Sequence, residues 1–280
     1  MPLIGAHISV AGGLAKAFPR ADEASCESIQ IFTRNQRQWQ TKVLSMQEIE
    51  AFYRAWEQSG VQAVVSHASY LVNLCGSGDI RKKSEKGLIA EIERCHQLGI
   101  NDIILHPGFA GDFSRDAAIE MIAESLLRAI DETQETRVRI LLETMAGQGT
   151  VVGGELRDLE DILNRVNWHK RIGACVDMCH IFASGYEVRS AEAYNRFIDA
   201  LDKHVTIERV GCWHLSDSKT EKGGKKDRHA HIGQGEIGLT AFSMLMNDER
   251  FADVPAVLET PKEGWGDAGN LSVLRKLRGG

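Results

Sequence analysis

Six short apolar runs in this chain end on a side chain that can bind a metal ion, and this pattern restricts the possible folds more than any other. The runs and their last residues are AVVSH with His67, DIILH with His106, RILLE with Glu143, GACVD with Asp177, VGCWH with His214 and AVLE with Glu259. Runs rich in Val, Ile and Leu that do not alternate with polar residues are typical of strands buried on both faces in parallel sheets. In a closed parallel barrel such strand ends meet on the C-terminal face, where active sites lie.

The rest of the chain alternates predicted strands with predicted helices. Two further strands are predicted over residues 3–9 and 28–32, and helices over 14–24, 45–59, 81–98, 116–133, 155–166, 191–204, 240–247 and 271–277. The six ligand-type residues are 39, 37, 34, 37 and 45 positions apart, slightly more than the roughly 31 residues of one βα unit in a typical barrel. We therefore predict a TIM (β/α)8 barrel, a single domain over residues 1–280, with enlarged loops on the C-terminal face.

Composition and charge argue against several classes of protein. The chain has 280 residues, 43% of them hydrophobic, yet no stretch approaches the ~20 apolar residues of a membrane span. The first residues, MPLIGAHISVAGG, lack the basic start and long apolar core of a signal peptide, so we expect a cytoplasmic protein with no membrane partner and six free cysteines. A formal net charge of −6 argues against non-specific coating of nucleic acid, although bound metal can make a local site positive.

Three more ligand-type side chains accompany the strand ends. His180 follows Asp177 by three residues, a spacing that places both on one side of a helical turn, and Asp227 and His229 have the spacing of side chains that point the same way in extended backbone. Singly, each is weak evidence, because a lone buried histidine is usually a core residue and an Asp after a strand is often a helix cap. Jointly, nine ligands exceed the roughly three that catalytic zinc takes from protein. We therefore expect two or three ions, with a carboxylate that bridges two of them.

These residues lie in sequence blocks that resemble the endonuclease IV family, the zinc-dependent apurinic/apyrimidinic endonucleases. The blocks are IGAHISVAGGL, IFTRNQRQW, HASYLVNL, LHPG, LETMAGQG, CVDMCHIFASGYE, HLSDSK, DRHAHIGQGEIG and LETP, in the family's order and over nearly the whole chain. The combination of DRHAHIG, CVDMCH and HLSDSK is highly specific. Two positions beside predicted ligands depart from the family: Ser216, where Asn is common, and Gln234, where an acidic residue is frequent.

The resemblance implies a TIM barrel with three zinc ions. It implies that His67 and His106 hold the first zinc, that Glu143 bridges the first and second, that Asp177, His214 and Glu259 complete the second, and that His180, Asp227 and His229 hold the third. The implied activity is hydrolysis of the phosphodiester 5′ to an abasic site in double-stranded DNA, which leaves a 3′-hydroxyl, with Glu143 as the catalytic residue. The family also implies a monomer.

The resemblance further implies which side chains touch DNA. Arg37, Tyr70 and Leu71 are expected to enter the duplex, because a nucleotide without a base is the least costly to extrude and apolar side chains often wedge into the gap. The alternative is that Tyr70 and Leu71 only pack their loop onto the barrel. Basic residues of two loops are expected to add positive charge, unless the lysine run is merely a solvated loop: Arg34, Arg37, Lys42, Lys219, Lys222, Lys225, Lys226 and Arg228.

Two other functions remain open on the sequence alone. A metal-dependent sugar isomerase or epimerase uses a similar barrel with Glu, Asp and His at strand ends, and fold alone does not settle function. Such an enzyme usually needs one or two metals, and it does not require the set formed by His180, Asp227 and His229. The other alternative is a non-catalytic lesion binder whose zinc only supports the fold. Two further histidines, His7 and His231, are expected to support ligands through hydrogen bonds.

Overall fold

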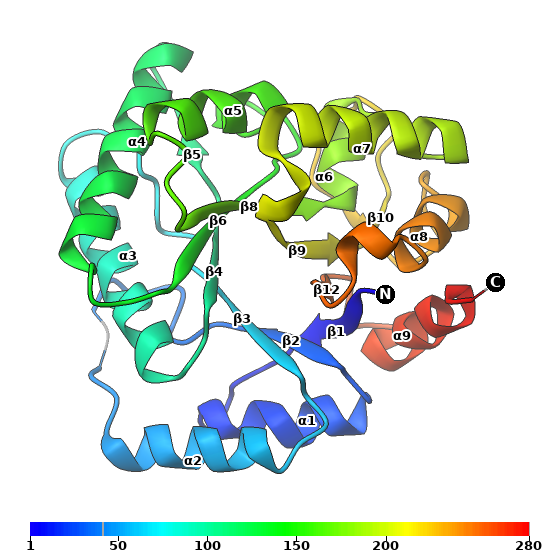
Figure 1. The fold of residues 1–280 in the computed structure, drawn as a ribbon, viewed down its shortest axis with the longest axis horizontal. Coiled ribbons are helices and arrows are strands. Elements are labelled where there is room, and N and C mark those ends of the chain that lie inside the picture. Colours follow the sequence, from blue (N-terminus) through cyan, green and yellow to red (C-terminus); the bar gives the residue numbers. More distant parts are fainter. Residues whose placement is uncertain (41, 280) are drawn as a thin grey trace.

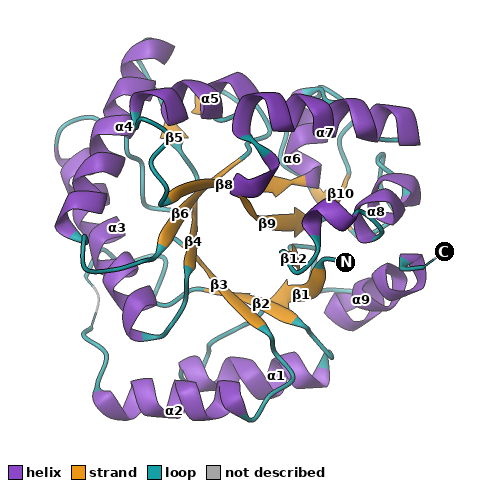
Figure 2. Ribbon diagram, viewed as in Figure 1, coloured by secondary structure: helices purple, strands orange, loops and turns teal. Residues whose placement is uncertain are grey.

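The computed structural model describes residues 1–40 and 42–279, and its central element is a closed barrel of eight parallel strands. Around the barrel the strands follow the chain: β1 (Leu3–His7), β2 (Ser28–Ile31), β3 (Ala63–His67), β4 (Asp102–Leu105), β6 (Arg139–Glu143), β8 (Ile172–Asp177), β9 (Val210–Leu215) and β12 (Pro255–Leu258), which pairs with β1. Figure 2 shows these strands as an inner ring with the helices outside it. The prediction of a TIM barrel is confirmed.

Helices connect successive strands and cover the outside of the barrel (Figure 1). They are α1 (Ala17–Glu23), α2 (Met46–Glu57), α3 (Asp79–Gln97), α4 (Arg115–Glu132), α5 (Leu156–Arg165), α6 (Met178–Ser184), α7 (Ala191–Val205), α8 (Leu239–Met246) and α9 (Gly266–Leu277). At the start of α2, the Ser45 side chain accepts a hydrogen bond from the Glu48 N–H and the Glu48 carboxylate accepts one from the Ser45 N–H. None of the helices in the described residues has both the length and the apolar character needed to cross a bilayer.

Apolar side chains form two core layers, one inside the barrel and one around it. The inner cluster takes one residue from each of six strands: Val65, Ile104, Leu141, Cys175, Cys212 and Val257. Each lies two positions before one of the six strand-end ligands. Because side chains alternate along a strand, residues two apart point to the same side. The inner cluster is therefore the apolar floor beneath the ligands.

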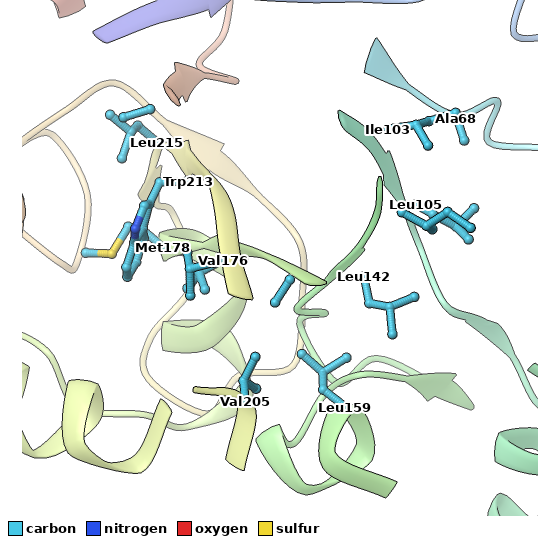
Figure 3. Close-up of a cluster of buried hydrophobic side chains, with 14 of the residues drawn as sticks. Ala68, Ile103, Leu105, Leu142, Leu159, Val176, Met178, Val205, Trp213 and Leu215 are labelled. Carbon is cyan, nitrogen blue, oxygen red and sulfur yellow. The ribbon is translucent and has the colours of Figure 1, made fainter. Parts of the chain in front are cut away.

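The outer core packs the strands against the helices. Figure 3 shows part of it, with Val176 of β8 and Trp213 of β9 drawn among side chains of the surrounding helices, such as Leu159 of α5 and Val205 of α7. These four side chains are all less than 2% exposed. Burial of one such side chain contributes about 1.5–3 kcal/mol, so the outer core is the main support of the ring that carries the ligands.

The structure differs from the predicted elements at several boundaries. Two small antiparallel sheets, β5 (Gly108–Phe109) with β7 (Val151–Val152) and β10 (Asp217–Ser218) with β11 (His229–Ala230), were not predicted. Strands of two residues are too short to show any periodicity. The last helix begins at Gly266, five residues before the predicted start, and α6 was predicted only as a helical turn. Gly266 and Gly269 hid the beginning of α9, because glycine is a poor helix former.

Candidate metal centre

The nine predicted ligands meet at the C-terminal mouth of the barrel. Six follow the strand ends: His67, Glu143 and Asp177 are the last residues of β3, β6 and β8, His214 is next to last in β9, and His106 and Glu259 directly follow β4 and β12. The strands β4 and β12 thus end one residue earlier than predicted. The other three ligands come from the connections: His180 lies in α6, and Asp227 and His229 lie in the long segment after β9. The Asp177 carboxylate caps α6 by accepting a hydrogen bond from the His180 N–H at 2.7 Å.

The nine residues form three groups in which the ligand atoms lie within 4.8 Å of one another. The groups are His67 and His106 with Glu143; Glu143 with Asp177, His214 and Glu259; and His180 with Asp227 and His229. One Glu143 oxygen lies 3.1 Å from Nε2 of both His67 and His106, and the other lies 3.0 Å from His214 Nδ1. Glu143 is therefore placed to bridge two ions, and the grouping is compatible with three.

Three of the imidazole rings are each fixed in orientation by a hydrogen bond to a backbone carbonyl. The Nδ1 atoms of His67, His180 and His229 each lie 2.7 Å from a carbonyl oxygen, which belongs to Ala68, Thr144 and Glu259 respectively. A carbonyl can only accept, so Nδ1 carries the proton and a neutral ring has its lone pair on Nε2. These Nε2 atoms face carboxylates, that of Glu143 for His67 and that of Asp227 for the other two.

Gln30, in the middle of β2, orients the fourth ring. Its amide nitrogen donates to the Glu259 carboxylate at 2.6 Å and to His7 Nδ1 at 2.9 Å. Its oxygen therefore faces His214 Nε2, at 2.7 Å, and the neutral ring turns its Nδ1 lone pair toward Glu143. Gln30 was not among the predicted site residues. A polar side chain inside the buried run SIQI is the signal that could have found it. His7 supports the ligands through Gln30.

Lone pairs that face other lone pairs require a cation between them. With neutral rings, Nε2 of His180 and of His229 points at the Asp227 carboxylate from 3.2 and 2.9 Å. These distances suit an ion pair, yet neither nitrogen has hydrogen-bond geometry with a partner in the described residues, nor does the buried Asp177 Oδ2. A buried polar atom left unpaired costs about 1–3 kcal/mol. Imidazoles and carboxylates are the ligands that zinc takes, so these residues fit that ion.

Protons replace the cation when no metal is bound. Burial alone would raise the pKa of Glu143, but the imidazoles, that of His214 above all, hold it well below its usual range. Burial alone would lower the pKa of His180 and of His214, but the surrounding carboxylates raise both well above the ordinary value. For His229, the burial penalty is outweighed by Asp227, and the pKa rises to about 9. A metal must displace these protons in order to bind.

A pocket of about 480 Å³ opens above the ligands. Its lining includes ligand side chains and the aromatic side chains of Phe32, Tyr70 and Phe109. The Tyr70 ring lies 5.4 Å from those of Phe32 and His67 and is 55% exposed. The pocket therefore offers both metal-binding and aromatic side chains to a bound molecule.

Of the residues expected to touch DNA, Tyr70 lines this pocket and Arg37 lines a second pocket that shares His7, Phe32 and Lys262 with it, and the contacts with DNA remain predictions. Arg37 and Tyr70 are exposed, and Leu71 is partly buried. The prediction that Arg34 adds positive charge to the surface is wrong: Arg34 is 8% exposed, and its Nε donates to the buried Glu91 at 2.8 Å. Sequence patterns could not show this burial, because Glu91 lies 57 positions away.

The two departures from the family pattern differ in their surroundings. Ser216 is fully buried just after β9, and its Oγ has no hydrogen-bond partner among the described residues. Gln234 is exposed, and its N–H donates to the His231 carbonyl at 2.9 Å. His231 was expected to support a ligand, but its Nδ1 instead accepts a hydrogen bond from Asn270 at 2.9 Å.

Known proteins resemble this chain in both sequence and fold. Residues 18–277 match a protein family described as a xylose isomerase-like TIM barrel. The chain is 44% identical to a probable endonuclease 4 from Chloroflexus aurantiacus over 280 residues, which is 99% of this chain and 98% of that protein. The crystal structure of endonuclease IV from Thermus thermophilus superposes with a TM-score of 0.88 at 35% identity, over 99% of this chain and 98% of that one. A D-tagatose 3-epimerase-like protein shares the fold, with a TM-score of 0.77 at 17% identity over 98% and 96% of the two chains.

Proposed function

Because the chain belongs to the endonuclease IV family, we propose that it is a DNA-repair endonuclease that hydrolyses the phosphodiester 5′ to an abasic site and leaves a 3′-hydroxyl. The observation that carries this proposal is the convergence of nine imidazole and carboxylate side chains into three groups, two of which share Glu143. We further propose that the protein is a single barrel domain over residues 1–280, which acts as a monomer in the cytoplasm on double-stranded DNA.

Three zinc ions complete the site in this proposal, one for each group. The first would be held by His67, His106 and Glu143, the second by Glu143, Asp177, His214 and Glu259, and the third by His180, Asp227 and His229. Bound zinc supplies Lewis acidity, which activates water near neutral pH and offsets negative charge on phosphate oxygens. Six positive charges against four ligand carboxylates leave a net charge of +2 at the mouth, so it attracts phosphate although the chain carries −6.

The side chains of the protein orient the reacting groups. The two oxygens of Glu143 face different rings, so this carboxylate sets the separation of the first two groups and is placed to orient the attacking water. Gln30 and the backbone carbonyls fix the rings, so little rearrangement accompanies the reaction. Arg37, Tyr70 and Leu71 would contact the DNA beside the extruded nucleotide.

Incision of an abasic duplex tests the proposal directly. The zinc-loaded protein should cut a duplex that carries one tetrahydrofuran abasic analogue on the 5′ side of the lesion. A DNA polymerase should then extend the product, because its new end is a 3′-hydroxyl. The undamaged duplex of the same sequence is the control and should stay intact. Failure of the metal-loaded protein to cut would overturn the proposed function, and binding without cutting would favour a lesion binder.

The second candidate is a metal-dependent sugar epimerase, which the shared barrel favours. The third group, with Asp227 in the loop after β9, argues against it, because such an enzyme does not require this set. Bound metal separates the two candidates. Three zinc ions per chain agree with the endonuclease, whereas one ion per chain together with epimerisation of a ketohexose would favour the epimerase.

A further inference from the structure

One face of α3 holds the 33–39 loop, which contains Arg37. Gly87, Glu91 and Arg94 are separated by four and three positions, so they lie on the same face of the helix. The Glu91 carboxylate accepts a hydrogen bond from Arg34 Nε at 2.8 Å, and both side chains are buried. Arg94 donates to a backbone carbonyl of the same loop, and a Cβ at Gly87 would already contact the Arg34 guanidinium at 3.4 Å. The helix thus fixes this loop at three points.

The same carboxylate holds a second rim loop, residues 68–78 after β3. The Ser69 N–H donates, at 3.2 Å, to the Glu91 oxygen that also binds the 33–39 loop. Ser69 Oγ donates to the Gln36 carbonyl at 2.7 Å and accepts from the Leu71 N–H at 3.3 Å. The two loops are therefore joined directly by Ser69 and indirectly by Glu91, although 33 positions separate Ser69 from Gln36.

The junction is next in the chain to two of the side chains that are expected to meet DNA. Arg37 is exposed and follows Gln36, whose carbonyl Ser69 holds. Tyr70 is exposed and follows Ser69. Its ring also lies 5.4 Å from that of Phe32, the residue before the 33–39 loop. Each probing side chain is thus one residue away from the link between the loops.

We infer that Glu91 and Ser69 are positioning residues, which join the 33–39 and 68–78 loops into one unit so that Arg37 and Tyr70 meet damaged DNA together. This inference deepens the proposed function and rests on it. Side chains held in their binding geometry before the ligand arrives lose less conformational entropy on binding. A buried ion pair adds little net stability, so the geometry it fixes is the better explanation for Glu91.

A double-mutant cycle in two backgrounds tests the coupling of the loops. In the wild-type background, Arg37→Ala and Tyr70→Ala should lower kcat/KM for an abasic duplex non-additively, because joined loops present the two side chains to DNA as one unit and the loss of one contact weakens the other. In the Ser69→Ala background the same two losses should add. Ser69→Ala alone should raise KM roughly tenfold, which corresponds to about 1.4 kcal/mol, with kcat unchanged. Non-additivity that persists in Ser69→Ala protein would overturn the inference.

Matched substitutions separate positioning from a general loss of stability. Ser28→Ala removes another buried hydroxyl, in β2, and Glu85→Ala removes another buried carboxylate of α3. Within the described part of the chain, neither side chain has a hydrogen bond or ion pair to either loop: Ser28 donates to the Leu3 carbonyl, and the partners of Glu85 are Ser125, Arg81 and Arg128. Both control variants should keep the cycle non-additive, and additivity in either would overturn the inference. Glu91→Gln, which keeps the side-chain volume, should act in the direction of Ser69→Ala.

Hydrogen exchange measures the link without DNA. The amides of Arg37 and Gln38 donate within their own loop, to the Asn35 side chain at 2.9 Å and to its carbonyl at 3.4 Å. Ser69→Ala should accelerate the exchange of these two amides, although it changes the other loop, whereas Ser28→Ala should not. Unchanged exchange would overturn the inference even if the protein cuts abasic DNA. Accelerated exchange in a protein that does not cut would overturn the proposed function and leave the link between the loops standing.

Discussion

Charged side chains are buried at both ends of the barrel, but two groups of them, one at each end, differ in their hydrogen bonds. At the N-terminal end, Arg171 is 6% exposed and makes five hydrogen bonds to oxygens of the 130–138 segment. Arg139 donates to both oxygens of Asp102, at 2.6 and 2.9 Å. At the C-terminal end, Asp177 Oδ2 and His180 Nε2 are buried and have no hydrogen-bond partner in the described residues.

This difference separates charges that support the fold from charges arranged for a ligand. A buried guanidinium whose donors are all used fixes the strands and loops around it. Carboxylates and imidazoles that face one another need a positive charge between them, which protons supply in the metal-free protein and a metal ion can supply in their place. Such convergence in a pocket is the better guide to function.

The largest expected effect compares one carboxylate at each end. Glu143→Gln should lower kcat/KM on an abasic duplex at least about a thousandfold, or about 4 kcal/mol in the barrier, because an amide cannot bridge two cations. Asp102→Asn makes the same chemical change at the N-terminal end and should leave kcat/KM of the folded protein unchanged. Steady-state kinetics, with circular dichroism as the check of folding, measure both. Equal losses in the two variants would remove the distinction between the ends.

Substitution of the buried arginine at the N-terminal end should lower the stability of the protein and leave its activity unchanged. Arg171→Met leaves several buried carbonyl and hydroxyl oxygens without a donor, so we expect a loss of about 2–3 kcal/mol and a Tm lower by roughly 5–10 °C. Thermal unfolding measures the change, and kcat of the folded variant should match that of the wild type. Arg137→Met, at an exposed neighbouring position, is the control. An unchanged Tm in Arg171→Met would show that these hydrogen bonds contribute little.

A smaller effect is expected from the residue that orients a ligand ring. Gln30→Leu removes the acceptor of His214 Nε2 and the donor to Glu259. The affinity for zinc should fall roughly 10–100-fold, as is usual when the hydrogen-bond partner of a ligand is lost. Competition with a chelator measures the affinity, and Gln38→Leu at an exposed position is the control. Equal zinc affinity in both variants would contradict the role assigned to Gln30.

The smallest effect concerns pH and has opposite signs with and without metal. The pKa of His229 rises from 6.5 to about 9 in the folded metal-free protein, because Asp227 outweighs the burial penalty. A raised pKa gives stability that is complete below pH 6.5 and is lost as the pH rises toward 9. The Tm of the metal-free protein should therefore fall over this window. With excess zinc, fewer protons compete with the metal for His229 as the pH rises, so the Tm should rise over the same window. Parallel pH dependence in the two samples would contradict metal binding by His229.

The ligand positions could be predicted because their signal is local. Each strand-end ligand closes a short apolar run of its own, and the alternation of side chains along the strand points it into the mouth. Arg34 was misinterpreted as a surface charge because a TRNQRQW segment contains no sign of the α3 face that buries it. Gln30 was missed for the same reason: its partners His214 and Glu259 are 184 and 229 positions away.

By itself, the sequence determined the barrel and the residue types that end its strands, since strand length, apolar content and side-chain alternation act over a few neighbouring positions. Only the tertiary structure decided that Glu143 belongs to two groups, which nitrogen of each histidine faces the metal site, and how Glu91 joins two rim loops. These features depend on hydrogen bonds and distances of a few ångströms between strands and helices far apart in the chain, and closure of the barrel alone brings them together.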